Sequence, residues 1–124
     1  MLAPAELALQ IALTKAFVAT NPTTVRLTPR TKTKDGTGVH FVNGEMRVPQ
    51  TFKLCDQSTA RNTWPGKVQT SDGVERLVDW ILVAAPDVIV KVNDFWVDAD
   101  GTWEVAELFP SNQYEVRAAV VRRA

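Results

Sequence analysis

The sequence is poor in the residues that build catalytic and metal centres. Its 124 residues contain one cysteine and one histidine, Cys55 and His40. A single cysteine excludes an internal disulfide and any site that needs several thiolates, and it suits a reducing compartment. A single histidine excludes a pair of imidazoles within one chain. We therefore expect no metal site, no cofactor and no enzymatic activity.

Neither sign of charge predominates, and no membrane-spanning run occurs. The 14 basic residues balance the 14 acidic ones, whereas a free-standing nucleic-acid-binding protein normally carries a basic excess. The apolar stretch 2–18 lacks a basic start and is interrupted by Glu6, Gln10 and Lys15, which argues against both a signal peptide and a membrane span. We expect a cytoplasmic protein that does not contact a membrane.

The length predicts a single domain, residues 1–124. A chain of 13.7 kDa buries about two-thirds of its unfolded surface, which is enough for one small core. The pattern of apolar and polar residues divides the chain into a helical extension over 1–21 and a β-barrel over 22–124, with a long loop at 57–72. No internal repeat or linker occurs.

Residues 3–19 have the pattern of a helix that is apolar over most of its circumference. Pro4 fits the first turn, Glu6 suits the positive end of the helix dipole, and Asn21-Pro22 ends the helix. We expect the wedge around Glu6, Gln10 and Thr14 to face water. Two interpretations stay open: the helix caps the barrel, or it packs against a neighbouring subunit, with docking residues Leu9, Leu13 and Phe17.

The remainder reads as about seven antiparallel strands with short turns. A polar hairpin arm is expected at 30–34, turning at Asp35-Gly36, and a tight turn at 98–101. Such strands suggest a mainly β fold, a small antiparallel barrel or sandwich that removes sheet edges by closure. Strand signals, besides the arm, cover residues 24–29, 39–42, 50–55, 76–85, 88–92, 94–97, 102–108 and 114–121.

Three features could serve a function. The first is the loop 57–72, because structureless loops of this length are uncommon in small domains and are usually functional. The second is the hairpin arm, which is either solvated or a docking element with Arg30, Lys32 and Lys34. The third is the Arg122-Arg123 tail, which we expect to be solvated. The candidate loop residues are Gln57, Arg61, Asn62, Trp64, Gly66, Lys67 and Gln69.

Other candidate sites are better explained by structure. Cys55 follows an alternating strand without a basic partner, which predicts a buried, unreactive thiol. The segment 98–101 resembles the start of a calcium loop but lacks the distal glutamate. The carboxylates Glu104, Glu107 and Glu115 show no pattern of an acid and base pair.

Five segments together resemble the head-to-tail stopper, or head-closure, proteins of long-tailed bacteriophages, in particular those of actinobacterial hosts. The resemblance covers residues 20–123 and rests on strand patterns and turns in a consistent order. The segments are NPTTVRLTPR at 21–30, PQTFKL at 49–54, DWILV at 79–83, NDFWVDADGTWEV at 93–105 and YEVRAAVVRR at 114–123.

The resemblance implies a structural virion protein of the phage neck, assembled in the host cytoplasm. Such proteins form a homo-oligomeric ring between the portal-bound adaptor and the tail. The ring closes the channel over the packaged double-stranded DNA and offers the docking surface for the tail terminator or tail tube. A six-fold tail favours a hexamer, and a dodecamer is the alternative.

In this family a long loop from each subunit reaches the channel axis. In this sequence, the loop 57–72 corresponds to that family loop. Arg61 and Lys67 against Asp72 give the loop a net charge of +1, and weak phosphate neutralisation suits a gate through which DNA later slides. Trp64 would pack between neighbouring loops, and Gly66 would act as the hinge.

Two other functions remain open. A tail-terminator ring protein belongs to the same assembly, and the long loop after Leu54 favours the stopper over it. A small nucleic-acid-binding barrel is the alternative from a different class, and it requires exposed aromatic side chains on a basic strand face.

Overall fold

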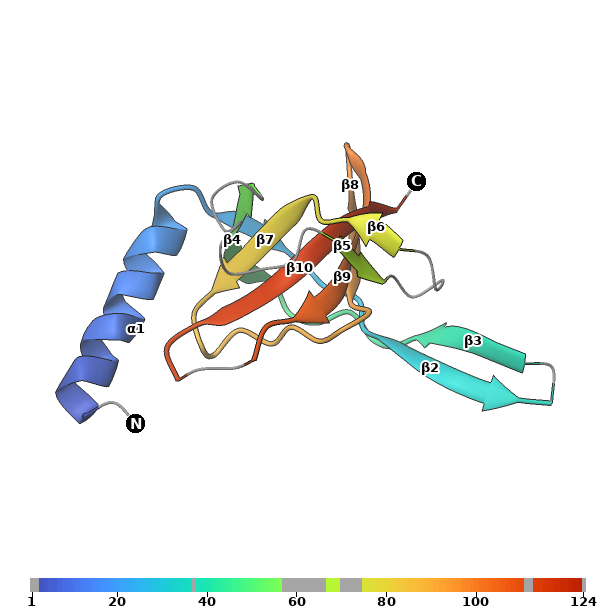
Figure 1. Cartoon of the computed structure of the whole chain (residues 1–124), viewed down its shortest axis with the longest axis horizontal. Coiled ribbons are helices and arrows are strands. Elements are labelled where there is room, and N and C mark those ends of the chain that lie inside the picture. The colour runs from blue at the N-terminus through green and yellow to red at the C-terminus, as the bar shows by residue number, and fades with distance from the viewer. Residues whose placement is uncertain (1–2, 37, 57–66, 70–74, 111–112, 124) are drawn as a thin grey trace.

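The computed structural model describes residues 3–36, 38–56, 67–69, 75–110 and 113–123. In this part of the chain one helix precedes ten strands (Figure 1). Their bounds are α1 (Pro4–Ala19), β1 (Thr23–Val25), β2 (Arg30–Asp35), β3 (Gly38–Asn43), β4 (Gln50–Asp56), β5 (Lys67–Gln69), β6 (Glu75–Leu77), β7 (Trp80–Ala84), β8 (Phe95–Asp98), β9 (Gly101–Leu108) and β10 (Val116–Arg123).

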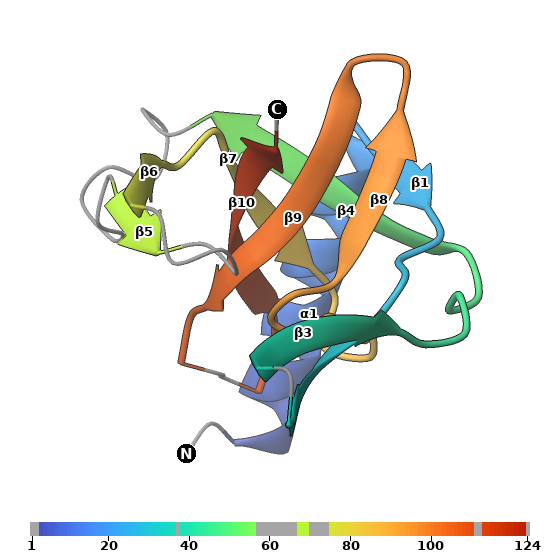
Figure 2. The ribbon, with the colours of Figure 1, turned by 90° about the vertical axis from the view of Figure 1, so that its right-hand side faces the viewer.

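Six strands form an antiparallel sheet that curls into a nearly closed barrel. The order is β1-β4-β7-β10-β9-β8. Just beyond β1, Thr28 pairs with Phe95 of β8, and the two residues exchange both backbone hydrogen bonds, at 2.9 and 3.1 Å. This contact joins the two edges of the sheet, as Figure 2 shows from the side of β8 and β9. The expectation of a mainly β, antiparallel barrel is confirmed.

The barrel interior holds the main core. Alternate residues point inward along each strand, and Phe52 packs against Trp96 with their ring centroids 5.6 Å apart. Trp96 and Trp103 stack at 6.4 Å. The buried members of this cluster are Leu27, Phe52, Leu82, Ala84, Val90, Trp96, Val105, Ala118 and Val120.

A second core lies on the outer face of β7 and β10. The short β5–β6 pair covers this face with Val68, and Val78 follows β6. Ile81 and Val83 of β7, together with Ala119 and Val121 of β10, are buried beneath it. Strands covered on both faces read as continuous apolar runs, which explains the unbroken sequence WILVA of β7.

The boundaries of several expected strands were wrong. The run 76–85 forms two strands, because the chain bends at Val78 and Asp79 to pass from the outer layer into the barrel sheet. Residues 88–92 form no strand; they belong to a connection whose Val90 enters the core. The Gln50 side chain holds this connection through two hydrogen bonds of 2.7 Å. Its Nε2 donates to the Ile89 carbonyl, and its Oε1 accepts from the Ile89 backbone amide.

The helix is present as expected, but its orientation differs. Pro4 opens α1, and the Thr20 backbone amide closes it by donating to the Phe17 carbonyl. The expected water-facing wedge is confirmed at Glu6, which is exposed, but is wrong at Thr14, which is buried and donates its hydroxyl to the Gln10 carbonyl at 3.1 Å; Gln10 is half-buried. Thr14 and Val18 are the buried residues of α1, which contacts β4 and β7 from outside the barrel.

Candidate assembly surfaces

The β2–β3 hairpin, here called the arm, projects from one end of the molecule (Figures 1 and 2). Its register runs from Arg30 opposite Asn43 to Asp35 opposite Gly38, so the expected arm and its turn are confirmed. Opposed residues of an antiparallel pair share a face. One face carries Lys32, Lys34, Val39 and Phe41, and the other carries Thr31, Thr33, His40 and Val42.

Arg30 fixes the arm at its root. The guanidinium forms an ion pair with the Glu104 carboxylate and donates from Nε to the Asn93 carbonyl at 3.0 Å. It lies 5.0 Å from the centroid of the Phe41 ring and 5.2 Å from that of Phe95. The side chain of Arg30 is 7% exposed and that of Glu104 fully buried. Arg30 was expected to dock a partner, but the burial of its side chain argues against that role for this residue.

A second ion pair holds the chain beside this root. Arg47 donates from Nε and Nη2 to the two oxygens of Asp94, at 3.1 and 3.3 Å. The Lys91 amide also donates to Asp94, at 3.1 Å. Asn93 has a φ of 78°, a left-handed conformation that asparagine adopts more readily than most residues. Together these contacts tie the connection between β3 and β4 to the one between β7 and β8.

Arg30 and Glu104 were considered separately in the sequence analysis, and their pairing was not predicted from it. Arg30 and Glu104 are 74 residues apart, and neither belongs to a local motif. The one available signal was Glu104 itself, an acidic residue between Trp103 and Val105 in an apolar strand. A buried pair of this kind holds a geometry firmly, since loss of one partner leaves an uncompensated charge. The arrangement therefore suits a rigidly presented arm.

The exposed apolar surface of α1 is the second candidate. Leu9, Leu13 and Phe17, here called the helix stripe, are 58%, 54% and 39% exposed. They follow one another at intervals of four residues and so share a face. Lys53 of β4 anchors the end of the helix, with Nζ 3.9 Å from the centroid of the Phe17 ring and 2.7 Å from the Thr20 hydroxyl.

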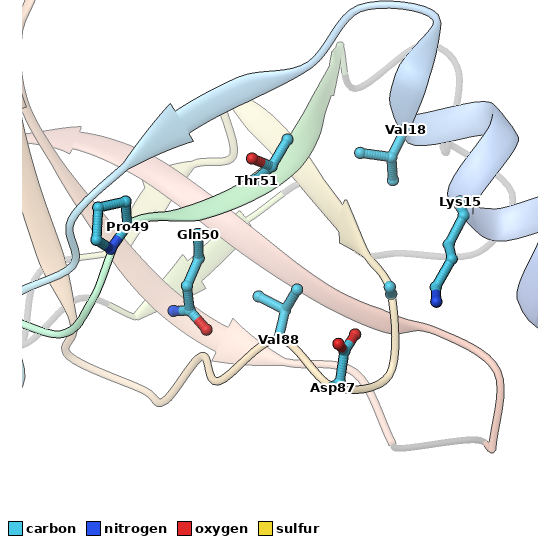
Figure 3. A pocket seen from close by; sticks show the side chains of 8 residues that line it. Lys15, Val18, Pro49, Gln50, Thr51, Asp87 and Val88 are labelled. Carbon is cyan, nitrogen blue, oxygen red and sulfur yellow. The ribbon is translucent and has the colours of Figure 1, made fainter.

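Two grooves flank α1. The first, of about 360 Å³, separates the helix from β4 and from the connection after β7; Figure 3 shows Lys15 and Val18 on one wall and Gln50 and Val88 on the other. The second, of about 290 Å³ and here called the α1–β10 groove, lies between the helix and the start of β10. Its lining comprises Gln10, Leu13, Thr14, Phe17, Tyr114, Glu115 and Arg117.

The candidate loop lies largely outside the described residues. Five of its seven candidate residues do so: Gln57, Arg61, Asn62, Trp64 and Gly66. Lys67 and Gln69 belong to strand β5, so the expectation of one structureless loop over 57–72 was wrong for this short segment. The loop starts at the end of β4 and returns to the outer layer of the barrel.

Cys55 and the turn at 98–101 agree with the sequence analysis. Cys55 is buried, and burial raises the pKa of its thiol, although Lys53 and Arg117 partly oppose this shift. Asp98 closes the β8–β9 turn and accepts hydrogen bonds from the indoles of Trp96 and Trp103. Over the described ranges no three acidic, histidine or cysteine side chains gather as a metal site. Among the described residues, no helix combines the length and the apolar character needed to cross a bilayer.

Searches of protein-family models, curated proteins and solved structures found no match to this chain.

Proposed function

We propose that this protein is a structural subunit of a bacteriophage neck. Several copies form a ring between the portal-bound adaptor and the tail, close the DNA channel after packaging and present the surface on which the tail docks. The protein acts in the virion, after assembly in the host cytoplasm, and its role is structural rather than catalytic. The resemblance of residues 20–123 to head-to-tail stoppers supports this choice among ring-forming proteins.

One geometric observation carries the proposal. Helix α1 and the arm lie at opposite ends of the molecule (Figure 1), and α1 carries the exposed helix stripe, so the molecule has two unlike surfaces. A protein that associates through two different surfaces forms a closed ring when the rotation between copies is suitable. An exposed apolar stripe also favours an interaction site over a surface that stays in water. A hexamer is favoured because it matches the six-fold tail.

Within the ring, the loop 57–72 is assigned to channel closure. Strand β4 of the barrel sheet leads into it, and β5, which lies within it, packs Val68 in the cluster on the outer face of β7 and β10. Repetition around the ring turns one modest loop into a many-fold constriction, so a single copy needs little affinity for DNA.

Replacement of Trp64 and deletion of 60–70 should make packaged heads leak DNA. Heads that stay fully DNA-tight would contradict the gating role.

A reconstruction of the phage neck, with this chain assigned to its density, tests the proposal most directly. The expected result is a ring between adaptor and tail in which residues 57–72 of every copy converge on the axis. If the chain instead borders the first ring of the tail tube with this loop outward, it is a tail terminator. Absence of the chain from the neck would refute both assignments.

A small nucleic-acid-binding barrel is less well supported. Such barrels stack bases on exposed aromatic side chains, whereas Phe52 and Trp96 are buried in the barrel and Trp80 and Trp103 pack against the same cluster. The net charge of zero also gives no general attraction to phosphate. A gel-shift assay with single-stranded DNA should show almost no binding by the isolated protein. Tight binding would favour the nucleic-acid-binding function.

A further inference from the structure

We infer that the arm of one copy docks in the α1–β10 groove of the next copy. The arm and the groove belong to opposite ends of the molecule (Figure 1), so one chain cannot bring its own arm to its own groove. The contact therefore joins two copies through different surfaces, which is the type of contact that builds a ring. This inference rests on the proposed ring function and names the surfaces that would form the ring.

The arm has the length and rigidity to serve as the inserted element. Its strands have six residues each, which corresponds to about 20 Å. The 16 residues of α1 extend over about 24 Å, so the arm can lie along most of the helix. An isolated two-stranded hairpin is marginally stable in water. The contacts of Arg30 with Glu104 and Asn93 hold the root of the arm. A neighbouring surface would stabilise the remainder of the hairpin.

Charge indicates which face of the arm meets the helix. On the face with Thr31, Thr33, His40 and Val42, the formally charged residue is Asp35, beside the turn, and Val42 is 48% exposed. The helix stripe of Leu9, Leu13 and Phe17 has no charged side chain of its own, and the charged residues of the groove, Glu115 and Arg117, pair with each other at 2.8 Å. Placing these two faces together leaves Lys32 and Lys34, on the other face of the arm, in water. The opposite orientation would bury two lysines against leucine and phenylalanine, at a large desolvation cost.

The size of the contact predicts how the ring assembles. One hairpin face laid on one helix buries on the order of 700 Å² in total, below the roughly 1,200 Å² that is usual for stable pairs. A single contact is therefore weak, and isolated copies are mainly monomeric. In a closed ring each copy makes the contact twice, once through its arm and once through its groove. Closure thus makes the last contact intramolecular and strengthens the whole assembly.

Cysteine cross-linking tests this contact. Leu13→Cys and Val42→Cys are made in separate proteins, one of which carries a size tag, and are mixed at high concentration with a short bismaleimide. The expected product is a mixed dimer that forms only when both variants are present. The double variant should give a ladder that ends at a closed ring. Both positions are exposed, so folding should be preserved and can be checked by circular dichroism.

Matched controls separate the possible results. Wild-type protein should not cross-link, because Cys55 is buried. Val97→Cys is a comparably exposed valine outside both surfaces, and it should not cross-link to Leu13→Cys. Self-linked Leu13→Cys dimers would overturn the inference in favour of a helix-to-helix contact. Absence of any mixed dimer would also overturn it. Neither failure affects the neck assignment, which the reconstruction tests separately.

Discussion

Arg30 and Glu104 form a buried ion pair where the arm leaves the barrel. The pair connects the first residue of β2 to the middle of β9, and the Phe41 and Phe95 rings flank the guanidinium. Arg123 approaches the same carboxylate, with its Nε 4.0 Å from Glu104 Oε1. The sequence suggests an exposed basic arm, whereas in the structure its first arginine holds the arm in place.

Replacement of Arg30 should destabilise the protein strongly. Arg30→Ala removes the nearer cation from the buried Glu104 carboxylate and leaves Arg123 at 4.0 Å; loss of one partner of a buried ion pair typically costs about 3–5 kcal/mol. Lys32→Ala, an exposed position on the same strand, should change the free energy of unfolding by less than about 0.5 kcal/mol. Urea denaturation of both variants measures the difference. Equal stabilities would show that Arg30 does not hold the arm.

The contact that closes the barrel should be visible in hydrogen exchange. The amides of Thr28 and Phe95 donate to each other's carbonyls, and Thr28 is buried. We expect both amides to exchange slowly, with protection similar to that of the central strands β7 and β10. Exchange by NMR at several times after transfer to D₂O measures this. Rapid exchange at both residues would mean that the barrel is open at this seam in solution.

The turn between β8 and β9 should make a small contribution to the free energy of unfolding, and this contribution should depend on pH. Burial alone would raise the pKa of Asp98, but hydrogen bonds from the Trp103 indole, the Asp100 amide and the Trp96 indole lower it below its ordinary value of 3.8. A carboxyl whose pKa is lower in the folded state stabilises the protein above that ordinary value. The contribution is lost as the pH falls through the folded-state pKa.

Asp98→Asn measures this contribution. At pH 7 the variant should be less stable than wild type by under about 1 kcal/mol, since the turn is exposed and solvent screens its charges. The difference in free energy of unfolding between the two proteins should disappear as the pH falls below 3.8. Unfolding curves of both proteins from pH 7 to strongly acidic conditions provide the comparison. A gap that stays constant over this range would contradict the role of the ionised carboxylate.

The thiol of Cys55 should react slowly in the folded protein. It is buried, and burial raises its pKa, so little thiolate is present near neutral pH. Thiolate is the reactive form. Labelling with Ellman's reagent should therefore be slow under native conditions and fast in urea. Fast native labelling would indicate that the β5–β6 cover opens readily, because Val68 packs in the same cluster as Cys55.

Local patterns account for the parts of the fold that the sequence predicted well. Pro4 and Asn21-Pro22 bound the helix, because proline is favoured in a first turn and disfavoured within a helix. Alternating residues identified most barrel strands, and the turns at 35–36 and 98–101 lie where small polar residues and glycine occur. The strand expected at 88–92 was wrong because apolar residues in a connection can enter the core without pairing, as Val90 does.

The sequence by itself determined the helix, most of the barrel strands, the arm and the burial of Cys55, because each depends on the chemistry of neighbouring residues. Only the tertiary structure decided the orientation of α1, since a helix that is apolar nearly all round has no preferred inner face. It also decided the partner of Arg30, because pairing across 74 residues depends on how the barrel closes. These two decisions left the helix stripe exposed and the arm fixed in position.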